Sequence, residues 1–483
     1  MFKGFKGFIF VCIIAALLGS ASAYAYYKFK NLSPEKILES SIVQNKVNSF
    51  VGDKTGGFSA LLPQFLGFTK PRTYLFLFEN NTEMRPGGGF LGLYATVQVD
   101  QGKINVLKVE GTEVLDHQTP ETWKPAAPQI LTEHLGVDRW YFRDSNWSPD
   151  FSVSAQKALE LYTGENGIAA GNIDTVVAFT PTVLERLMKI TGPFTVEGTE
   201  FTSENVIEKL EYEVEYDWKD NGRSFENRKG IVKTFMQALM VHLKNDAFLH
   251  FNEYSNLLRD LGNEKHIIFY SKDTALESVI ENLGWTGRVK NPASDYLLWV
   301  DANLAALKTD HAMVRNLEYS IEPQGANFVA HAKMTYTHTG SFDWRTSRYR
   351  TYARVYVPSG AKLIDVKGAM KTYRSKEVGK VDEGEDLAHH WFGAFIAIEP
   401  GKVGTLEFSY VLPDSVSTAI RDGKYALLTQ KELGLVDTAL TLNLNFGKNI
   451  GSATPPEDKK DWGNTTYTMQ SNLKIDRNFS VGF

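Results

Sequence analysis

The stretch Thr73–Gly111 decides the fold of the first half of the chain. It consists of TYLFLFEN, then NTEMRPGGG, then FLGLYATVQVDQGKINVLKVEG. The first run, Thr73–Asn80, is apolar between polar neighbours, which predicts a buried strand. The third run has β-rich halves on either side of Asp100–Gly102, which predicts a hairpin. The middle segment, with one arginine and three glycines, is either a tight turn or a loop shaped for a ligand.

Strand-like and helix-like patterns alternate on both sides of this stretch, over residues 70–300. Ile173–Phe179 and Lys265–Ser271 have the composition of strands, and Ser152–Gly164 has the pattern of a helix that ends at glycine. Strands that alternate with helices predict an α/β domain, a layered sheet covered by helices.

The pattern changes near Asp301. Segments such as ANFVAHAKMTYTH (Ala326–His338) and YRTYARVYVP (Tyr349–Pro358) alternate apolar and polar residues, and turn signals such as Glu399–Gly401 separate several of them. No helical pattern stands out among them. Residues 301–483 are therefore expected to form a C-terminal all-β sandwich.

The N-terminus carries the longest apolar run. Phe8–Tyr27 has no charged residue and is long enough to cross a bilayer, which predicts a transmembrane signal anchor over residues 1–30 and a juxtamembrane helix and linker over 31–69. Lys3 and Lys6 precede the run, so the N-terminus is expected in the cytoplasm of a single-pass cell-membrane protein, with most of the chain extracellular or periplasmic. The alternative is a signal peptide cleaved after Ala21–Ala23.

Composition excludes several classes of protein. The 483 residues carry a net charge of −5, which argues against a nucleic-acid partner. Cys12 is the single cysteine, so neither an intrachain disulfide nor a cysteine-ligated zinc site is possible.

The polar segment after the first strand is a candidate anion site. Gly87, Gly88 and Gly89 permit positive φ and expose backbone N–H groups, and Arg85 supplies a planar fork for phosphate or carboxylate. Arg143 and Arg228 are the arginines that could join it. The alternative is a structural turn with an arginine held in a salt bridge.

Four carboxylates could hold a divalent cation such as Mg²⁺ or act as a base. Glu79 and Glu83 flank the candidate anion site, and Asp144 and Asp150 lie in RDSNWSPD (Arg143–Asp150), where oxygen side chains alternate as in a calcium loop. The match ends there, because Pro149 takes the place of the loop's glycine. The alternative for Asp150 is a helix cap.

Four stretches together resemble an uncharacterised bacterial family, the domain of unknown function four-thousand-twelve: NNTEMRPGGGFLGLYA, RDSNWSPDF, IDTVVAFTPTVLERLMKITGPFTV and RTYARVYVP. The resemblance implies a membrane-anchored bacterial surface protein and carries no activity with it.

The α/β part is also distantly similar to LytR-CpsA-Psr phosphotransferases, which transfer glycopolymers from polyprenyl-pyrophosphate carriers to the cell wall. The order of strand, arginine segment (Asn80–Arg85), hairpin and arginine-started helix (from Arg228) agrees. Where that family has an Arg-Asp pair, this chain has Glu110–Glu113.

Two hypotheses about function follow. In the first, the protein binds or transfers an anionic lipid-linked glycan or pyrophosphate, such as a polyprenyl-phosphate glycan or a cell-wall polymer, at the membrane. In the second, it is a non-enzymatic cell-surface interaction or structural protein that uses its β-sandwich.

Overall fold

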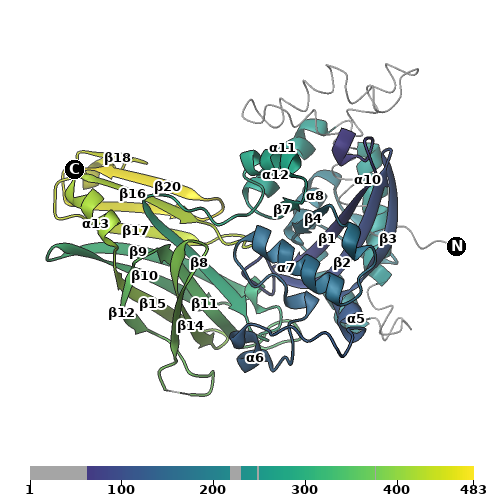
Figure 1. The fold of residues 1–483 in the computed structure, drawn as a ribbon, viewed down its shortest axis with the longest axis horizontal. Coiled ribbons are helices and arrows are strands. Elements are labelled where there is room, and N and C mark those ends of the chain that lie inside the picture. The colour runs from purple at the N-terminus through teal and green to yellow at the C-terminus, as the bar shows by residue number, and fades with distance from the viewer. Residues whose placement is uncertain (1–62, 218–229, 247–249, 376) are drawn as a thin grey trace.

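The run that opens with TYLFLFEN folds into three consecutive strands, which form most of the N-terminal sheet. The computed structural model describes residues 63–217, 230–246, 250–375 and 377–483 (Figure 1). The sheet has the order β3-β2-β1-β4-β7. Its strands are β1 (Arg72–Asn80), β2 (Phe90–Asp100), β3 (Lys103–Gly111), β4 (Thr175–Phe179) and β7 (Ile267–Ser271).

Helices cover both faces of this sheet, because successive residues of β1 point to opposite sides. Tyr74 and Phe76 pack with α8 (Thr182–Thr191), α10 (Gly230–Asp246), α11 (Phe251–Asn263) and α12 (Thr274–Leu283). Leu75 and Leu77 pack on the other side with α7 (Phe151–Gly164).

Shorter elements complete this half. They are α5 (Thr112–His117), α6 (Gln129–Leu135), α9 (Val206–Tyr212), the hairpin β5 (Phe194–Val196) and β6 (Thr199–Phe201), the single turns η2 (Phe142–Asp144) and η3 (Ala170–Asn172), and the π-helix η4 (Glu213–Asp217).

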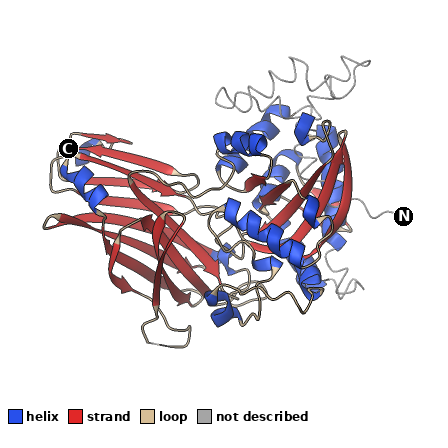
Figure 2. Ribbon diagram, in the orientation of Figure 1, coloured by secondary structure: helices blue, strands red, loops and turns tan. Residues whose placement is uncertain are grey.

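The C-terminal half consists of two packed sheets (Figure 2). The first, in spatial order, contains β12 (Lys362–Lys367), β15 (Val403–Val411), β10 (Asn327–His338), β9 (Met313–Gln324), β17 (Ala439–Asn445) and β19 (Thr466–Asn472). The second contains β13 (Val381–Asp386), β14 (His389–Ile398), β11 (Tyr349–Pro358), β8 (Asp295–Asn303), β16 (Lys424–Gln430), β20 (Arg477–Gly482) and β18 (Ser452–Thr454).

One continuous core lies between the two sheets. Alternate residues of β9 and β10, such as Leu317, Tyr319 and Ala332, meet Val355 and Phe392 of the opposite sheet. The helix α13 (Asp414–Arg421) closes one end through Val416 and Ile420, and the single turns η6 (Thr309–Ala312) and η7 (Lys459–Asp461) lie in the connections.

The glycine-bearing segment after β1 is the joint between the two halves. The backbone N–H of Asn303 donates to the carbonyl of Met84 at 2.9 Å, and that of Asp310 donates to Thr82 at 3.1 Å. Asn81 Nδ2 donates to the carbonyl of Gly434 at 2.9 Å. A segment expected to be a turn or a ligand loop therefore carries backbone contacts that dock the sandwich onto the helical half.

The fold class expected from the sequence, a transmembrane helix followed by an α/β domain and an all-β sandwich, is wrong. The described chain is mostly β-sheet. In the N-terminal sheet only β1 and β4 run parallel, whereas the β2–β1, β3–β2 and β4–β7 pairs are antiparallel. In the C-terminal half, α13 forms where no helix was expected. Residue periodicity shows where strands lie, but the connections decide their direction.

The membrane part of that expectation is not supported either. None of the described helices is long and apolar enough to cross a membrane. The run Phe8–Tyr27 and most of the expected juxtamembrane segment lie outside the described residues.

Candidate functional site

A pocket of about 420 Å³ opens at the end of the N-terminal sheet where β1 and β4 finish. Its volume is in the range of small-molecule sites. The lining residues come from eight stretches of the chain, and they are Phe78, Glu79, Asn80, Phe90, Gly92, Leu93, Thr112, Glu113, Arg143, Phe179, Thr180, Pro181, Leu184, Ile207, Leu210, Glu211, Val214, Glu215, Val232 and Lys308.

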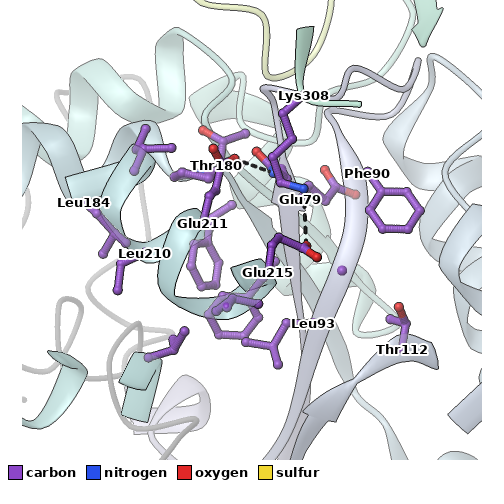
Figure 3. A pocket seen from close by; sticks show the side chains of 18 of the residues that line it. Glu79, Phe90, Leu93, Thr112, Thr180, Leu184, Leu210, Glu211, Glu215 and Lys308 are labelled. Atoms are coloured by element: carbon purple, nitrogen blue, oxygen red, sulfur yellow. Dashed lines mark hydrogen bonds and ion pairs between the residues drawn. The ribbon is translucent and has the colours of Figure 1, made fainter. Parts of the chain in front are cut away.

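One wall of the pocket is apolar because two helices turn their hydrophobic faces toward the sheet. Ile207, Leu210 and Val214 recur at helical spacing along α9 and η4. Leu184 of α8 lies beside them, and in Figure 3 it appears with Leu210 on one side of the pocket, opposite Phe90. An apolar wall of this kind suits a hydrocarbon chain.

The floor of the pocket includes a buried carboxyl group. Glu79, the second-last residue of β1, is 1% exposed, and its Oε1 accepts a hydrogen bond from Asn146 Nδ2 at 3.2 Å. Burial raises the pKa of Glu79 well above its usual range, although the bond from Asn146 opposes the shift. Burial therefore favours the neutral form of this carboxyl.

The two cations of the pocket are Arg143 and Lys308, and each is held by a carboxylate. Arg143 Nη1 donates to Asp116 Oδ2 at 2.8 Å, and Lys308 Nζ lies 3.3 Å from Glu215 Oε1. A guanidinium has five N–H donors and an ammonium has three, so these contacts leave each cation able to bind a ligand.

A chain of alternating charges runs behind Arg143. Its Nε lies 3.6 Å from Asp144, and the other oxygen of Asp144 lies 3.9 Å from Arg85. Burial raises the pKa of Asp144, while the two guanidinium groups lower it. At the other end, burial raises the pKa of Asp116 to about 6, and burial together with the charge of Asp116 raises that of Glu165 to about 9. At neutral pH Glu165 therefore retains its proton, whereas Asp116 is mostly ionised and pairs with Arg143.

The C-terminal half supplies part of the rim. Lys308 comes from the connection after β8, and Arg345, from the connection before β11, lies 2.6 Å from Glu211 Oε2. The other oxygen of Glu211 accepts hydrogen bonds from Asn80 at 2.8 Å and Thr82 at 2.6 Å. The helix that walls the pocket is therefore clamped between the two halves.

Residues 69–214 match a family model whose description is "Protein of unknown function (DUF4012)". This segment, about a third of the chain, is similar to that family. It contains all the pocket residues except Glu215, Val232 and Lys308. A comparison with curated proteins gives no match.

The similarities to solved structures are weak. The chain is similar to a "putative nutrient binding protein" from Legionella pneumophila subsp. pneumophila str. Philadelphia 1, with 8% identity, 39% of this chain and 71% of that chain covered, and a TM-score of 0.23. It is also similar to an M1 zinc metallopeptidase from Deinococcus radiodurans, with 10% identity, 35% of this chain and 42% of that chain covered, and a TM-score of 0.19. Neither likeness carries an argument.

Arg85 does not line the pocket. It is 3% exposed, and its Nη1 donates to the carbonyl groups of Asn303 at 2.6 Å and Met84 at 3.1 Å. Its Nη2 lies 3.4 Å from Glu83. Arg143 shares Asp144 with it, whereas Arg228 lies outside the described residues. The structure thus brings Arg85 and Arg143 to one carboxylate, but only Arg143 reaches the pocket.

The three glycines have a packing role. A Cβ on Gly87 would lie 2.6 Å from the Cβ of Asn146, and one on Gly88 would lie 2.3 Å from Glu79 Oε2. Gly88 and Gly89 also adopt φ of +134° and +145°, which side chains rarely tolerate. Because these positions carry no side chain, the joint packs closely against Asn146 and Glu79 at the floor of the pocket.

The residues named for metal binding do not share one centre. Asp150 caps α7, since its Oδ1 accepts from the backbone of Ser152 and its Oδ2 accepts from that of Val289. Glu79 is held by Asn146, and Glu83 and Asp144 flank Arg85. Within the described residues, no group of three or more His, Cys, Asp or Glu side chains is arranged to hold a metal ion.

Sequence reasoning missed the contribution of the C-terminal half to this site. Lys308, Trp344 and Arg345 lie in connections of a β-rich region, where nothing local separates them from ordinary surface residues. The available signal was the dense EYEVEY at 211–216, where glutamates and tyrosines recur at helical spacing.

Proposed function

We propose that the protein binds a lipid-linked glycan, with the apolar carrier chain in the pocket and the carrier phosphate beside Arg143 and Lys308. The observation that carries this proposal is the pocket itself, which joins a hydrocarbon-like wall to a polar end with two cations. The resemblance to LytR-CpsA-Psr phosphotransferases agrees with this class of ligand. We propose binding and no transfer reaction, because Glu110–Glu113 replaces the Arg-Asp pair of that family.

The charges around the pocket are compatible with an anionic head group. Of the four glutamates that line the pocket, burial favours the neutral form of Glu79, and Glu211 and Glu215 pair with Arg345 and Lys308; the fourth is Glu113. The side chain of Lys308 is 18% exposed and that of Arg143 28% exposed, so both side chains are partly open to a ligand. A phosphate oxygen would then accept charge-assisted hydrogen bonds from both groups.

Filling the apolar wall is expected to abolish most of the binding of a prenyl chain. Leu184→Trp places an indole where the chain would lie and excludes three or four methylene groups, each worth about 0.8 kcal/mol. We expect the Kd for geranylgeranyl phosphate to rise about 100-fold, as measured by isothermal titration calorimetry. The control is Val153→Trp on the exposed face of α7, which should bind as the unaltered protein does. Equal affinity in the two variants would exclude the pocket as the site.

Replacing Arg143 by lysine tests the phosphate contact. Arg143→Lys keeps the charge beside Asp116 but loses the two parallel donors of the guanidinium. We expect the preference for geranylgeranyl phosphate over geranylgeraniol to fall about tenfold, while the affinity for the alcohol is unchanged. The unchanged alcohol affinity reports an intact pocket. If the preference persists, the phosphate does not bind at Arg143.

A further inference from the structure

Three aromatic side chains gather at the rim of the pocket and come from both halves of the chain. Tyr212 ends α9, Tyr216 lies in η4, and Trp344 lies in the connection before β11. The two tyrosine rings are nearly parallel, at 20° with centroids 5.9 Å apart. Trp344 stands at 77° to each, with centroids 5.3 and 5.4 Å away. The tyrosines are nevertheless 45% and 46% exposed.

Two of these rings are next in the chain to residues that line the proposed ligand site. Glu211 and Glu215 line the pocket, and each is followed in the chain by one of the tyrosines. Figure 3 shows these glutamates at the pocket, with Lys308 paired to Glu215. A ligand whose head group projects out of the pocket past Glu215 would therefore meet the aromatic rings.

The rings are held rigidly in place. The hydroxyl of Tyr216 donates to the backbone carbonyl of Trp344 at 3.1 Å, and the neighbouring Arg345 pairs with Glu211. Tyr212 and Tyr216 are four residues apart and share one face of the helical segment, where α9 passes into the π-helical turn of η4. Such turns are frequent at functional sites, and a fixed ring loses little conformational entropy when a ligand stacks on it.

The geometry decides among ligands that bind to aromatic rings. The rings are in contact with one another, with centroids below 6 Å apart, so they leave no space for a quaternary ammonium group between them. The net charge of −5 argues against a nucleic acid as the stacking ligand. A pyranose ring fits better, because its axial C–H bonds pack on an aromatic face and its hydroxyl groups donate to carboxylates.

We infer that Tyr212, Tyr216 and Trp344 form a sugar-binding subsite for the glycan of the ligand whose carrier chain enters the pocket. This inference rests on the proposed function for the identity of the ligand, but the subsite binds sugar through contacts of its own. All-equatorial pyranoses, such as glucose and N-acetylglucosamine units joined by β-1,4 links, present the flattest C–H faces to such rings.

Soluble trisaccharides test the subsite without any lipid. Cellotriose and chitotriose are titrated into the full-length protein up to about 10 mM, a concentration that nearly saturates a site with a Kd of about 1 mM, and binding is followed by saturation-transfer NMR. We expect at least one of them to bind. The double variant Tyr212→Ala/Tyr216→Ala should weaken this binding about 5- to 100-fold, since each ring contributes about 2- to 12-fold.

Matched variants distinguish the loss of ring stacking from any effect of a substitution on the protein as a whole. Tyr212→Phe/Tyr216→Phe keeps both rings and should retain the binding, and Trp462→Ala removes a 61% exposed ring of the sandwich and should leave it unchanged. Binding that is equal in the alanine and phenylalanine double variants would overturn the subsite. Failure of both trisaccharides to bind the unaltered protein would also overturn it.

The subsite and the proposed function can fail separately. Leu184→Trp should lose geranylgeranyl phosphate and keep the trisaccharide, whereas the alanine double variant should show the reverse. If geranylgeranyl phosphate does not bind but the trisaccharide binds through the tyrosines, the proposed function is wrong and the sugar subsite stands. If the prenyl phosphate binds and neither sugar does, the proposed function stands and the subsite is wrong.

Discussion

Arg315→Met is expected to lower the free energy of unfolding by about 3–5 kcal/mol, because it leaves buried carboxylates without their cation. Arg315 Nε donates to Asp301 at 2.9 Å, and its Nη2 donates to Asp310 and to the hydroxyl of Tyr349. Arg315 is 4% exposed, and both aspartates are buried. The loss should be measured from urea unfolding followed by tryptophan fluorescence.

The effect should extend to the joint between the halves. The second oxygen of Asp310 accepts hydrogen bonds from the backbone N–H of Met84 at 2.9 Å and from Asn303 Nδ2 at 2.8 Å, so Arg315 indirectly orders the segment after β1. The control is Arg348→Met, which breaks a half-exposed pair with Glu399 and should cost less than about 1 kcal/mol. Equal shifts in the two variants would contradict a structural role for the buried network.

Lys431→Met is expected to make the slope of the free energy of unfolding against pH less positive between pH 7 and 10. Burial, and then the charge of Lys265, lower the pKa of Lys431 to about 7, whereas an unfolded lysine titrates near 10.4. Between these values the unfolded chain binds the extra proton. The contribution of Lys431 to the free energy of unfolding therefore rises with pH by up to about 1.4 kcal/mol per unit. Below pH 7 the side chain is charged in both states, and the full cost of burying that charge remains.

Comparing Lys431→Met with the unaltered protein separates the titration of Lys431 from that of other groups in the same pH range. Burial, and then the charge of Asp116, raise the pKa of Glu165 to about 9, and a raised carboxyl pKa makes stability fall as the pH rises toward 9. The readout is therefore the difference in slope between the unaltered protein and Lys431→Met, from urea unfolding at several pH values. Lys474→Met, with a half-exposed ammonium, should leave the slope unchanged. Parallel curves for Lys431→Met and the unaltered protein would show that Lys431 is not titrating in this window.

The strands of the helical half show how much of the fold the local sequence pattern predicts. TYLFLFEN predicts a buried strand, and β1 covers Arg72–Asn80, with alternate residues in two separate cores. The hairpin expected around Asp100–Gly102 joins β2 to β3. The alternation of strands and helices nevertheless led to the wrong class, because neighbouring strands pair antiparallel wherever a short turn connects them.

The role of the segment Arg85–Gly89 could not be predicted from the sequence alone. Arginine and glycine together predict either an anion loop or a turn, and the sequence leaves both open. The structure shows a third role, since Arg85 binds the carbonyl of Asn303 and a Cβ on Gly88 would collide with Glu79. Asn303 is 218 positions from Arg85, so no spacing in the sequence could reveal that contact, and Glu79 meets Gly88 only because the chain folds back after β1.

The sequence by itself determined where the apolar stripes lie, because a strand or helix buries one face whatever its neighbours are. It also singled out Arg143 and Glu79 as polar residues beside strand and helix ends. Only the tertiary structure decided that Arg143 and Lys308, 165 positions apart, share a pocket, and that Trp344 meets Tyr212 and Tyr216. The reason is physical: the docking of the sandwich depends on backbone hydrogen bonds and buried charges, which become favourable only when both halves are folded.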